Sequence, residues 1–395
     1  MNESKRTVRR SRGAALPHAL IVDNLRALES LRRALQTAQR IAVDTESNSL
    51  YAYREQVCLI QITAESGDYL IDPLRFDPYK DLAFLGELLA SPHIEKVLHA
   101  AEYDVMCLRR DFGFTMSNLF DTMVAARILG WERVGLADLL VKYFGTKPDK
   151  RHQLADWGRR PLSPDMLRYA QMDTHFLLRL RDELYTLLQE GDHLAEAHEL
   201  FDEVCRAEWS RDEFDPDGFW RITKASQLDA QAAAVLRELY LYREEEAQQR
   251  DLPVFKVVGD STLLQLAESQ PASTEALAEV KGMTRGQVRR YAAGILAAIA
   301  RGQEAPPLDR PRMNGQRPDE SVIRRFDALH TWRKERAAAR GVSSDIVMPK
   351  DALWEIARRG PTCLSDLEAI DSLGPWRLAT YGAEVVRVLA ELSAS

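Results

Sequence analysis

Cysteine is scarce in this 395-residue sequence, and its four copies stand far apart, at Cys58, Cys107, Cys205 and Cys363. No Cys-x-x-Cys pair is present, so the common paired-cysteine motif for a metal or redox centre is missing. Long apolar runs and a recognisable signal peptide are missing as well, so we expect no membrane span and no export. These absences predict a cytoplasmic protein in a reducing compartment, with its cysteines as inert core residues.

A surplus of basic residues is also missing, because the formal net charge is −7. A net negative charge is unusual for a nucleic-acid-binding protein, since phosphate contacts come mainly from Lys and Arg. Residues 1–209 hold 27 Lys and Arg against 32 Asp and Glu, so most of the acidic excess lies there. We interpret two basic clusters as a flexible tail over residues 1–16 and a solvated helix face. They consist of Lys5, Arg6, Arg9, Arg10 and Arg12, and of Arg324, Arg325, Arg333, Lys334, Arg336 and Arg340.

A Gly-x-x-x-x-Gly-Lys-Ser/Thr loop occurs nowhere, which leaves no recognisable site for a nucleotide-driven motor. What is present is an ordinary globular composition, with 45% hydrophobic and 29% charged residues. The length suggests two or three domains, each with room for a sizeable core.

Two carboxylates follow an apolar run near the start of the chain. Residues 41–46 read as a strand, and its alternation places Asp44 and Glu46 on the same face, where they can share one cation. An Asp-x-Glu pair on its own is more often solvated at a strand end. Asp44 is harder to dismiss, because a carboxylate next to a buried run is costly without a partner.

Two further segments carry residues that could join this pair. Tyr169 and Asp173 stand four apart in a stretch with helical period, so both point from adjacent turns toward one place. Asp104 lies near the first turn of a helix expected after a short strand at 96–98. Each of the three patterns alone is ordinary. A Tyr-x-x-x-Asp pair, for example, most often places the tyrosine in the core and the aspartate on the surface. The order of the three segments along the chain nevertheless predicts one site.

Four carboxylates suffice for two divalent cations. Two such ions roughly 3.5–4 Å apart can activate a water and stabilise the leaving oxygen in phosphodiester cleavage. Because Mg²⁺ and Mn²⁺ prefer carboxylate and water oxygens, a set without His or Cys favours them over zinc. The predicted metal ligands are therefore Asp44, Glu46, Asp104 and Asp173.

These segments resemble the three exonuclease motifs of the DEDD superfamily of 3′-5′ exonucleases, in the branch with tyrosine in the last motif. The segment from His152 to Leu162 narrows the resemblance to the ribonuclease D family, over essentially the whole chain. The motifs that carry the resemblance are Val43-Asp44-Thr45-Glu46, His99-Ala100 followed by Asp104, Phe120-Asp121-Thr122, and Tyr169-Ala170-Gln171-Met172-Asp173.

The resemblance implies a role for each site residue. Asp44, Glu46 and Asp173 would hold the first metal, with Asp44 bridging to a second. Asp104 would support the second metal, and Tyr169 would orient the attacking water as a neutral phenol. The implied reaction releases nucleoside 5′-monophosphates from the 3′ hydroxyl end of RNA, with tRNA precursors as the expected partner. No membrane partner is expected.

Other residues near these motifs have two interpretations. Trp157, Arg159 and Arg160 fit stacking or phosphate contact, with packing slightly favoured. Asp121 is expected to cap the helix that begins at Thr122. Gln61 and His99 are left outside the predicted site, because substrate contact and ordinary hydrogen bonding fit both equally.

The order of elements predicts an α/β fold followed by an all-α part. Strands near 41–46, 57–63 and 68–72 are joined by short connections, and the strand near 96–98 lies between helices. This pattern indicates a mixed sheet flanked by helices, in agreement with the ribonuclease H-like fold that the resemblance implies. We expect a 3′-5′ exonuclease domain over residues 17–208.

The remainder contains an internal repeat. Sliding the sequence by 90 residues aligns Tyr242-Arg243 with Trp332-Arg333 and Tyr291 with Tyr381. The two copies resemble HRDC domains, expected at residues 209–302 and 319–395 with a linker at 303–318. Equivalent turns at 281–284 and 371–374 precede helices, where phosphate binding and simple capping both fit.

Three functions are compatible with these residues. A 3′-5′ exoribonuclease is favoured, but its RNA preference comes from the resemblance alone. A DNA 3′-5′ exonuclease is an alternative, because two-metal chemistry at the phosphate does not require a 2′-hydroxyl. A non-catalytic RNA-binding protein is the other, although the intact carboxylates speak against it.

Overall fold

The computed structural model of the chain describes residues 16–209, 214–310, 318–370 and 372–393. The expected basic tail, apart from Leu16, lies outside the described residues, as do residues 311–317 of the expected linker and Asp371 of the second turn. No helix in the described ranges is long and apolar enough to cross a membrane.

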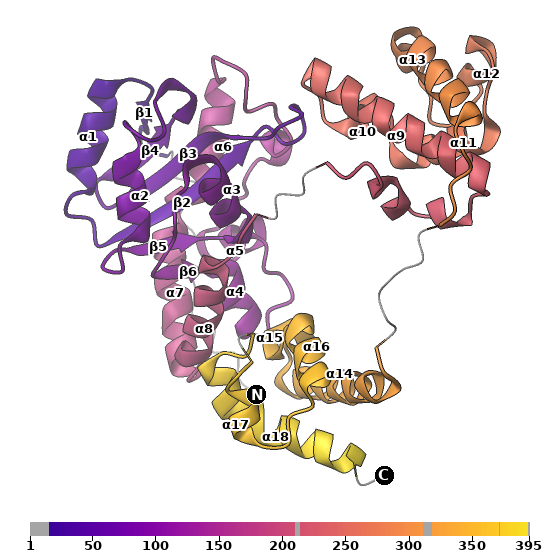
Figure 1. Cartoon of the computed structure of the whole chain (residues 1–395). Helices are drawn as coiled ribbons and strands as arrows, with labels where there is room; N and C mark the ends of the chain where they lie inside the picture. The colour runs from indigo at the N-terminus through magenta and orange to yellow at the C-terminus, as the bar shows by residue number, and fades with distance from the viewer. Residues whose placement is uncertain (1–15, 210–213, 311–317, 371, 394–395) are drawn as a thin grey trace. The chain divides into compact units, whose positions relative to one another are not determined.

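A mixed six-stranded sheet forms the centre of the first domain (Figure 1). The strand order is β1-β4-β3-β2-β5-β6. β3 pairs antiparallel with β4, whereas the pairs β1–β4, β2–β5 and β5–β6 are parallel. The strands are β1 (Leu20–Val22), β2 (Arg40–Ser47), β3 (Val57–Ala64), β4 (Gly67–Ile71), β5 (Glu95–Leu98) and β6 (Leu119–Asp121).

Helices cover both faces of this sheet, because the inner strands are apolar on both sides. On β3, Ile60 and Ile62 join the larger core cluster, while Leu59 points the other way into a smaller cluster with Trp157 and Ala170. The helices of the domain are α1 (Leu25–Leu35), α2 (Ala83–Ala90), α3 (Glu102–Phe112), α4 (Thr122–Ile128), α5 (Leu136–Phe144), α6 (Pro164–His175), α7 (Leu177–Glu190) and α8 (Leu194–Cys205), with short 3-10 turns η1 (Pro73–Arg75) and η2 (Lys150–His152).

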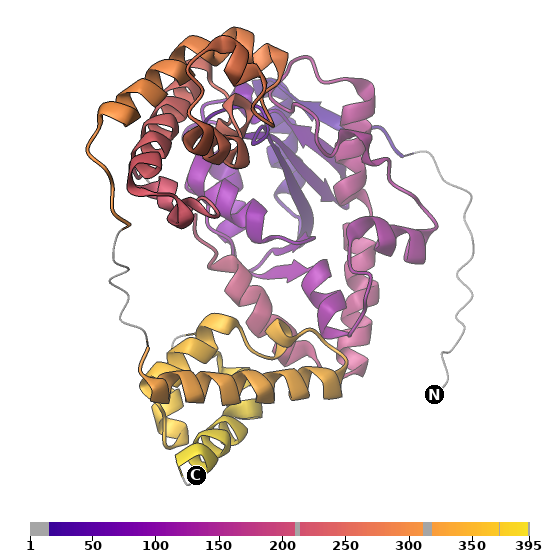
Figure 2. The ribbon, with the colours of Figure 1, turned by 90° about the vertical axis from the view of Figure 1, so that its right-hand side faces the viewer.

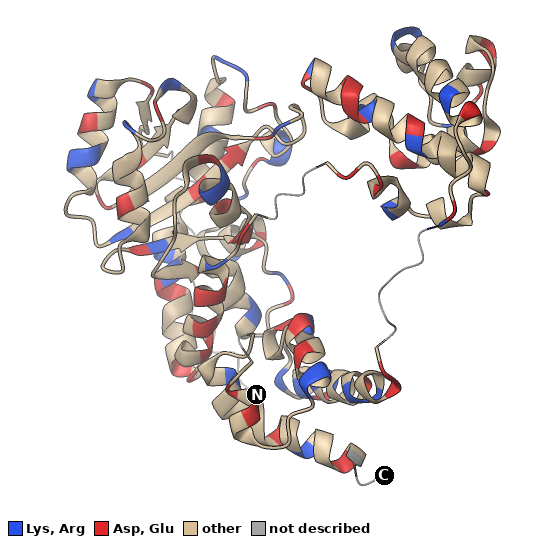
Figure 3. Cartoon of the chain, in the orientation of Figure 1, with Lys and Arg blue, Asp and Glu red and all other residues tan. Residues whose placement is uncertain are grey.

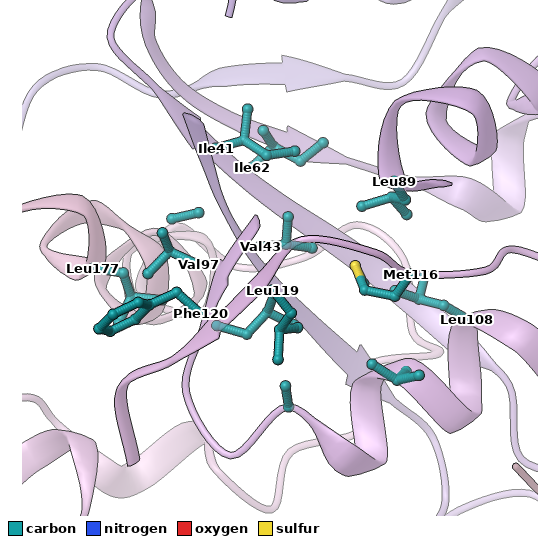
Figure 4. Close-up of a cluster of buried hydrophobic side chains, with 14 of the residues drawn as sticks. Ile41, Val43, Ile62, Leu89, Val97, Leu108, Met116, Leu119, Phe120 and Leu177 are labelled. Atoms are coloured by element: carbon teal, nitrogen blue, oxygen red, sulfur yellow. The ribbon is translucent and has the colours of Figure 1, made fainter. Parts of the chain in front are cut away.

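The larger core cluster joins the sheet to the helices around it (Figure 4). Ile41 and Val43 of β2 are buried there beside Val97 of β5, with Leu108 of α3 and Leu177 of α7. Burial of each such side chain contributes roughly 1.5–3 kcal/mol. β2 is thus anchored by its apolar residues immediately before its two carboxylates.

The rest of the chain consists of two helical modules of the same design (Figures 1 and 2). Each runs from one long helix through three short ones to a second long helix. The first module follows the turns η3 (Gly218–Arg221) and η4 (Ala225–Gln227) and contains α9 (Ala230–Arg250), α10 (Val254–Val257), α11 (Asp260–Ser269), α12 (Thr274–Ala278) and α13 (Arg285–Glu304). The second contains α14 (Glu320–Arg340), α15 (Ser344–Val347), α16 (Lys350–Arg359), α17 (Leu364–Leu367) and α18 (Pro375–Ser393).

The 90-residue repeat holds at the level of these elements, because the first residue of each helix in the second module stands 90 positions after its counterpart. The predicted fold class, a mixed sheet flanked by helices followed by helical modules, is confirmed. The short strands β1 and β6 were not expected from the sequence.

The described residues form two compact units. One contains the α/β domain and the second module, and the other contains the first module with residues 47–56. Within the first unit, the second module packs on α8: the Arg340 guanidinium donates to both carboxylate oxygens of Glu196, at 2.8 and 2.7 Å. Glu196 is fully buried, so its charge would be costly there without the hydrogen bonds from Arg340.

Candidate metal centre

β2 and α6 each deliver two of the predicted site residues. Asp44 and Glu46 lie in the half-buried end of β2, after the buried residues Ile41, Ala42 and Val43, and Tyr169 and Asp173 lie one turn apart on α6. The first turn of α6 is defined by its own sequence: Pro164 is its first residue, and the Ser163 hydroxyl accepts from the Met166 N–H at 3.2 Å.

Three carboxylates converge between these elements. One oxygen each from Asp44, Glu46 and Asp173 can be chosen so that all lie within 4.8 Å of one another. Asp104 belongs to α3 and is 7% exposed. Its carboxylate accepts a hydrogen bond from the Thr45 hydroxyl, which lies between Asp44 and Glu46 on β2. The four predicted ligands are therefore brought into one region, with Asp104 outside the closest three.

Like charges are crowded at this site. Burial raises the pKa of the Asp44 carboxyl well above its ordinary value, and neighbouring carboxylates, Asp104 first, raise it further. Burial and the charge of Asp173 raise the pKa of Glu46 to about 9. These shifts have the sign expected for carboxylates that lack a cation, and a divalent ion would reverse them. The oxygen-only donor set fits Mg²⁺ or Mn²⁺.

The other two carboxyls respond to hydrogen bonds as well as to burial. Burial raises the pKa of Asp104 to about 7, although the Thr45 hydroxyl opposes the shift. Burial likewise raises the pKa of Asp173 to about 7, against a hydrogen bond from Tyr169. Burial and the adjacent Asp173 raise the pKa of the Tyr169 phenol above its ordinary value, so this hydroxyl remains a donor at neutral pH.

A buried polar network holds α6 against the sheet, and the sequence analysis did not identify it. Asp68 on β4 accepts from Gln171 Nε2 at 2.6 Å and lies 2.7 Å from His175 Nδ1. Its other oxygen accepts from the Thr63 hydroxyl at 2.8 Å. Gln171 and His175 stand four apart on α6, a spacing that could have marked them as facing the sheet, but nothing local to Asp68 shows its partners.

In the segment before α6, Trp157 and Arg160 pack against the domain, whereas Arg159 is exposed and pairs with Asp156. Trp157 is 1% exposed, and its ring centre lies 6.0 Å from that of Tyr169. Arg160 binds Asp72 through two hydrogen bonds, at 2.6 and 2.7 Å, and donates to the Cys58 carbonyl at 2.7 Å. The packing interpretation therefore holds for Trp157 and Arg160.

Asp121 and His99 also have defined partners. The Asp121 carboxylate accepts from the Met123 and Val124 amides of α4, as expected for its cap, and also from the Ala101 amide before α3. His99 Nδ1 lies 2.9 Å from the Thr122 hydroxyl. Asp121 thus ties together the starts of two helices, one of which carries Asp104.

A cleft of about 460 Å³ opens beside Tyr169, a size typical of small-molecule sites. Four basic or potentially basic side chains line it, against two acidic ones: Lys147, Arg151, His152 and Arg168, against Asp149 and Asp165. The His152 ring stands edge-on to Tyr169, with centres 6.3 Å apart. A mononucleotide-sized anion therefore has room and positive charge next to the predicted catalytic tyrosine.

Known protein families match the segments of the chain that contain nearly all of the elements described above. Residues 20–189 match the 3′-5′ exonuclease family, and residues 232–299 and 323–389 each match the HRDC domain. Ribonuclease D of Granulibacter bethesdensis is 30% identical over 377 residues, which cover 94% of this chain and 92% of that protein. Protein RRP6-like 1 of Arabidopsis thaliana is 31% identical over 294 residues; the match covers 72% of this chain but only 46% of the plant protein.

A solved structure shows the same organisation. Escherichia coli RNase D, described as an exoribonuclease involved in structured RNA processing, is 25% identical with a TM-score of 0.66. The match covers 95% of this chain and 99% of that structure. The similarity therefore extends through both helical modules.

Proposed function

Because this chain belongs to the ribonuclease D family of 3′-5′ exonucleases, we propose that it shortens RNA from the 3′ hydroxyl end and that its substrates are tRNA precursors. The products are nucleoside 5′-monophosphates. One observation carries the proposal: three carboxylates from β2 and α6 converge within 4.8 Å, next to a protonated tyrosine.

Two divalent cations complete the proposed site. Asp44, Glu46 and Asp173 would hold the first, and Asp104 on α3 would help Asp44 to hold the second. Mg²⁺ and Mn²⁺ suit this oxygen-only set, because both are hard ions that retain water ligands. Bound at such a site, the ions supply positive charge to the attacking and leaving oxygens of a phosphodiester.

The chain's own residues position the reactants. The Tyr169 hydroxyl, which stays protonated and donates its hydrogen to Asp173, orients the attacking water by accepting a hydrogen bond from it. Trp157 packs beside that ring and limits its movement. Lys147, Arg151 and Arg168 in the adjacent cleft offset phosphate charge while the terminal nucleotide is held.

A cytoplasmic location completes the proposal. Cys58, Cys107 and Cys205 are buried thiols that form no disulfide, and Cys363 is an exposed thiol that forms none either. Thiols remain reduced in the cytoplasm, so this set suits that compartment. Cell fractionation tests the location, and recovery of the protein outside the cytoplasmic fraction contradicts it.

The decisive experiment incubates the purified chain with a 5′-labelled tRNA precursor, with Mg²⁺ or with EDTA. We expect a ladder that shortens by single nucleotides from the 3′ end in Mg²⁺ only. The Asp44→Asn variant is the matched control, since it removes one charge without changing the size of the side chain. An unchanged RNA in Mg²⁺ would favour a non-catalytic RNA-binding protein, and equal turnover of a matched DNA strand would favour a DNA exonuclease.

A further inference from the structure

Gln61 on β3 is a buried polar side chain whose hydrogen-bonding groups have no partner. The residue is fully buried, and neither its amide nitrogen nor its amide oxygen makes a hydrogen bond. Within the described ranges it is the one buried side chain whose donor and acceptor are both unpaired. A buried amide in this condition costs free energy, so we expect that a partner for it exists.

The neighbours of Gln61 on β3 show which face of the sheet its side chain occupies. Alternation along the strand places it on the same face as Leu59 and Thr63. Leu59 belongs to the cluster that contains Ala170 of α6, and the Thr63 hydroxyl lies 2.8 Å from the Thr174 hydroxyl of α6. Gln61 stands between these two contacts, so its side chain faces the turn of α6 from Ala170 to Thr174.

The strands on either side of β3 bring different chemistry to this face. On β4 the residue opposite Gln61 is Leu70, an apolar member of the same cluster. On the other side lies β2, whose Asp44 and Glu46 converge with Asp173 of that turn of α6. Figure 3 shows the contrast between β2, which carries red acidic residues, and β3, which is drawn tan. Gln61 thus lies between an apolar neighbour and the strand that carries two of the predicted metal ligands.

The polar network that holds α6 on the sheet does not include Gln61. The Asp68 carboxylate in that network is already occupied by Thr63, Gln171 and His175. Gln61 makes no bond to it, although it is the next residue after Thr63 on this face of β3. The attachment of α6 to the sheet therefore does not explain why an amide is buried at this position.

An amide suits both kinds of group that a centre loaded with divalent ions presents. The ions keep their carboxylate ligands ionised, and an ionised carboxylate accepts hydrogen bonds at the lone pairs that the ion does not use. Mg²⁺ and Mn²⁺ also retain water ligands, which donate hydrogen bonds. The Gln61 N–H groups match the carboxylates, and its carbonyl oxygen matches the water. Neighbours of this kind orient metal ligands, and their loss weakens metal binding.

We propose that Gln61 is a positioning residue of the metal centre. Its buried amide donates to the carboxylates of β2 and holds Asp44 and Glu46 in the arrangement that binds the divalent ions. The inference rests on the proposed function, because it requires those ions. On this account the amide contributes to ion binding and not to the stability of the metal-free fold.

Mn²⁺ binding, measured by electron paramagnetic resonance of the free ion, tests the proposal without RNA. The test variant is Gln61→Met, which keeps the length of the side chain and removes both hydrogen-bonding atoms. The control variant is Thr63→Val, on the same face of the same strand, which removes the hydroxyl that pairs with Asp68. Urea denaturation of both variants and the unmodified chain in EDTA accompanies the titration.

The two variants should differ in opposite ways. Gln61→Met should bind Mn²⁺ roughly 10–100-fold more weakly, and its urea midpoint in EDTA should equal or exceed that of the unmodified chain. Thr63→Val should lower the urea midpoint and leave the Mn²⁺ affinity unchanged. Normal Mn²⁺ binding by Gln61→Met would overturn the proposal. So would a loss of stability in EDTA as large as that of Thr63→Val, because the amide would then have a partner in the metal-free fold.

A crystal structure of the unmodified chain with Mn²⁺ is an independent measurement that needs no variant. The Gln61 amide nitrogen should lie within hydrogen-bonding distance of a carboxylate oxygen of Asp44 or Glu46. An ordered Mn²⁺ with this amide bonded elsewhere would overturn the inference and leave the proposed function intact. Failure of the unmodified chain to bind Mn²⁺ in either experiment would refute the proposed metal centre itself, and this inference with it.

Discussion

The phenol of Tyr169 donates a hydrogen bond to the carboxylate of Asp173, one turn further along α6, and thereby lowers the pKa of that carboxyl against the effect of burial. One residue thus influences both parts of the site. It favours the ionised form of a predicted metal ligand, and it keeps a protonated hydroxyl beside the place where water would attack.

Tyr169→Phe should therefore slow the chemical step roughly 10²-fold while RNA affinity changes little. The ring remains to pack on Trp157, so the fold is retained. Single-turnover rates in saturating Mg²⁺, compared with RNA binding in EDTA, separate the two effects. A variant with the full single-turnover rate would exclude the water-orienting role.

Asp44→Asn should reduce turnover by at least about 10³-fold, since the ions contribute several kcal/mol to the transition state. In EDTA the same variant should be more stable than the unmodified protein, by on the order of 1 kcal/mol, because one of the crowded charges is gone. Urea denaturation measures this difference. A less stable variant would show that Asp44 stabilises the folded state rather than destabilising it.

The stability of the metal-free protein should fall as pH rises from about 5 to 9. The folded pKa is raised to about 9 for Glu46 and to about 7 for Asp104 and Asp173. The folded state therefore binds more protons than the unfolded state in this window, and the free energy of unfolding decreases with pH. Denaturation at pH 5.5, 7 and 8.5 in EDTA measures the slope.

Addition of Mg²⁺ should restore stability most at the high end of that range, because the ion binds the ionised carboxylates. Asp68 does not change the direction of this pH dependence. Hydrogen bonds from His175 and Gln171 lower its pKa despite burial, so its effect on stability falls below pH 5. A free energy of unfolding that rises with pH in EDTA would contradict the crowding of carboxylates at this site.

Gly374→Ala should displace the Glu199 carboxylate from the Trp376 and Arg377 amides and loosen the second module on α8, because the new methyl group would lie 2.1 Å from Glu199 Cδ. Hydrogen exchange of the α8 amides should then increase. Gly286→Ala in the first module is the matched control, since its nearest contact would be 3.9 Å away, at the Thr284 hydroxyl. Unchanged protection of α8 in Gly374→Ala would show that the contact with Glu199 is dispensable.

Local patterns predicted the parts of this protein that depend on neighbouring residues. The alternation around Asp44 and Glu46 and the four-residue spacing of Tyr169 and Asp173 correctly indicated a strand and a helix. The cap at Asp121 and the 90-residue repeat follow from signals of the same kind, a short side chain before a helix and a recurring hydrophobic pattern.

Features that depend on distant pairing were not predictable in this way. β1 and β6 are three residues each, too short to show alternation, and they exist because a neighbouring strand is available. The buried Asp68 finds Gln171 across 103 positions, and Glu199 finds Arg377 across 178. A single sequence holds no signal for such partners, although burial of a charge requires that some partner exist.

The packing of the second module on α8 also changes what a break in the backbone would do. The first module follows α8 and precedes α14, so both ends of its segment return to one body. A protease that nicks the chain between the two modules would leave both fragments bound through Glu196, Glu199 and their arginines. Such a nicked protein should elute from a sizing column as one species and separate only in denaturant.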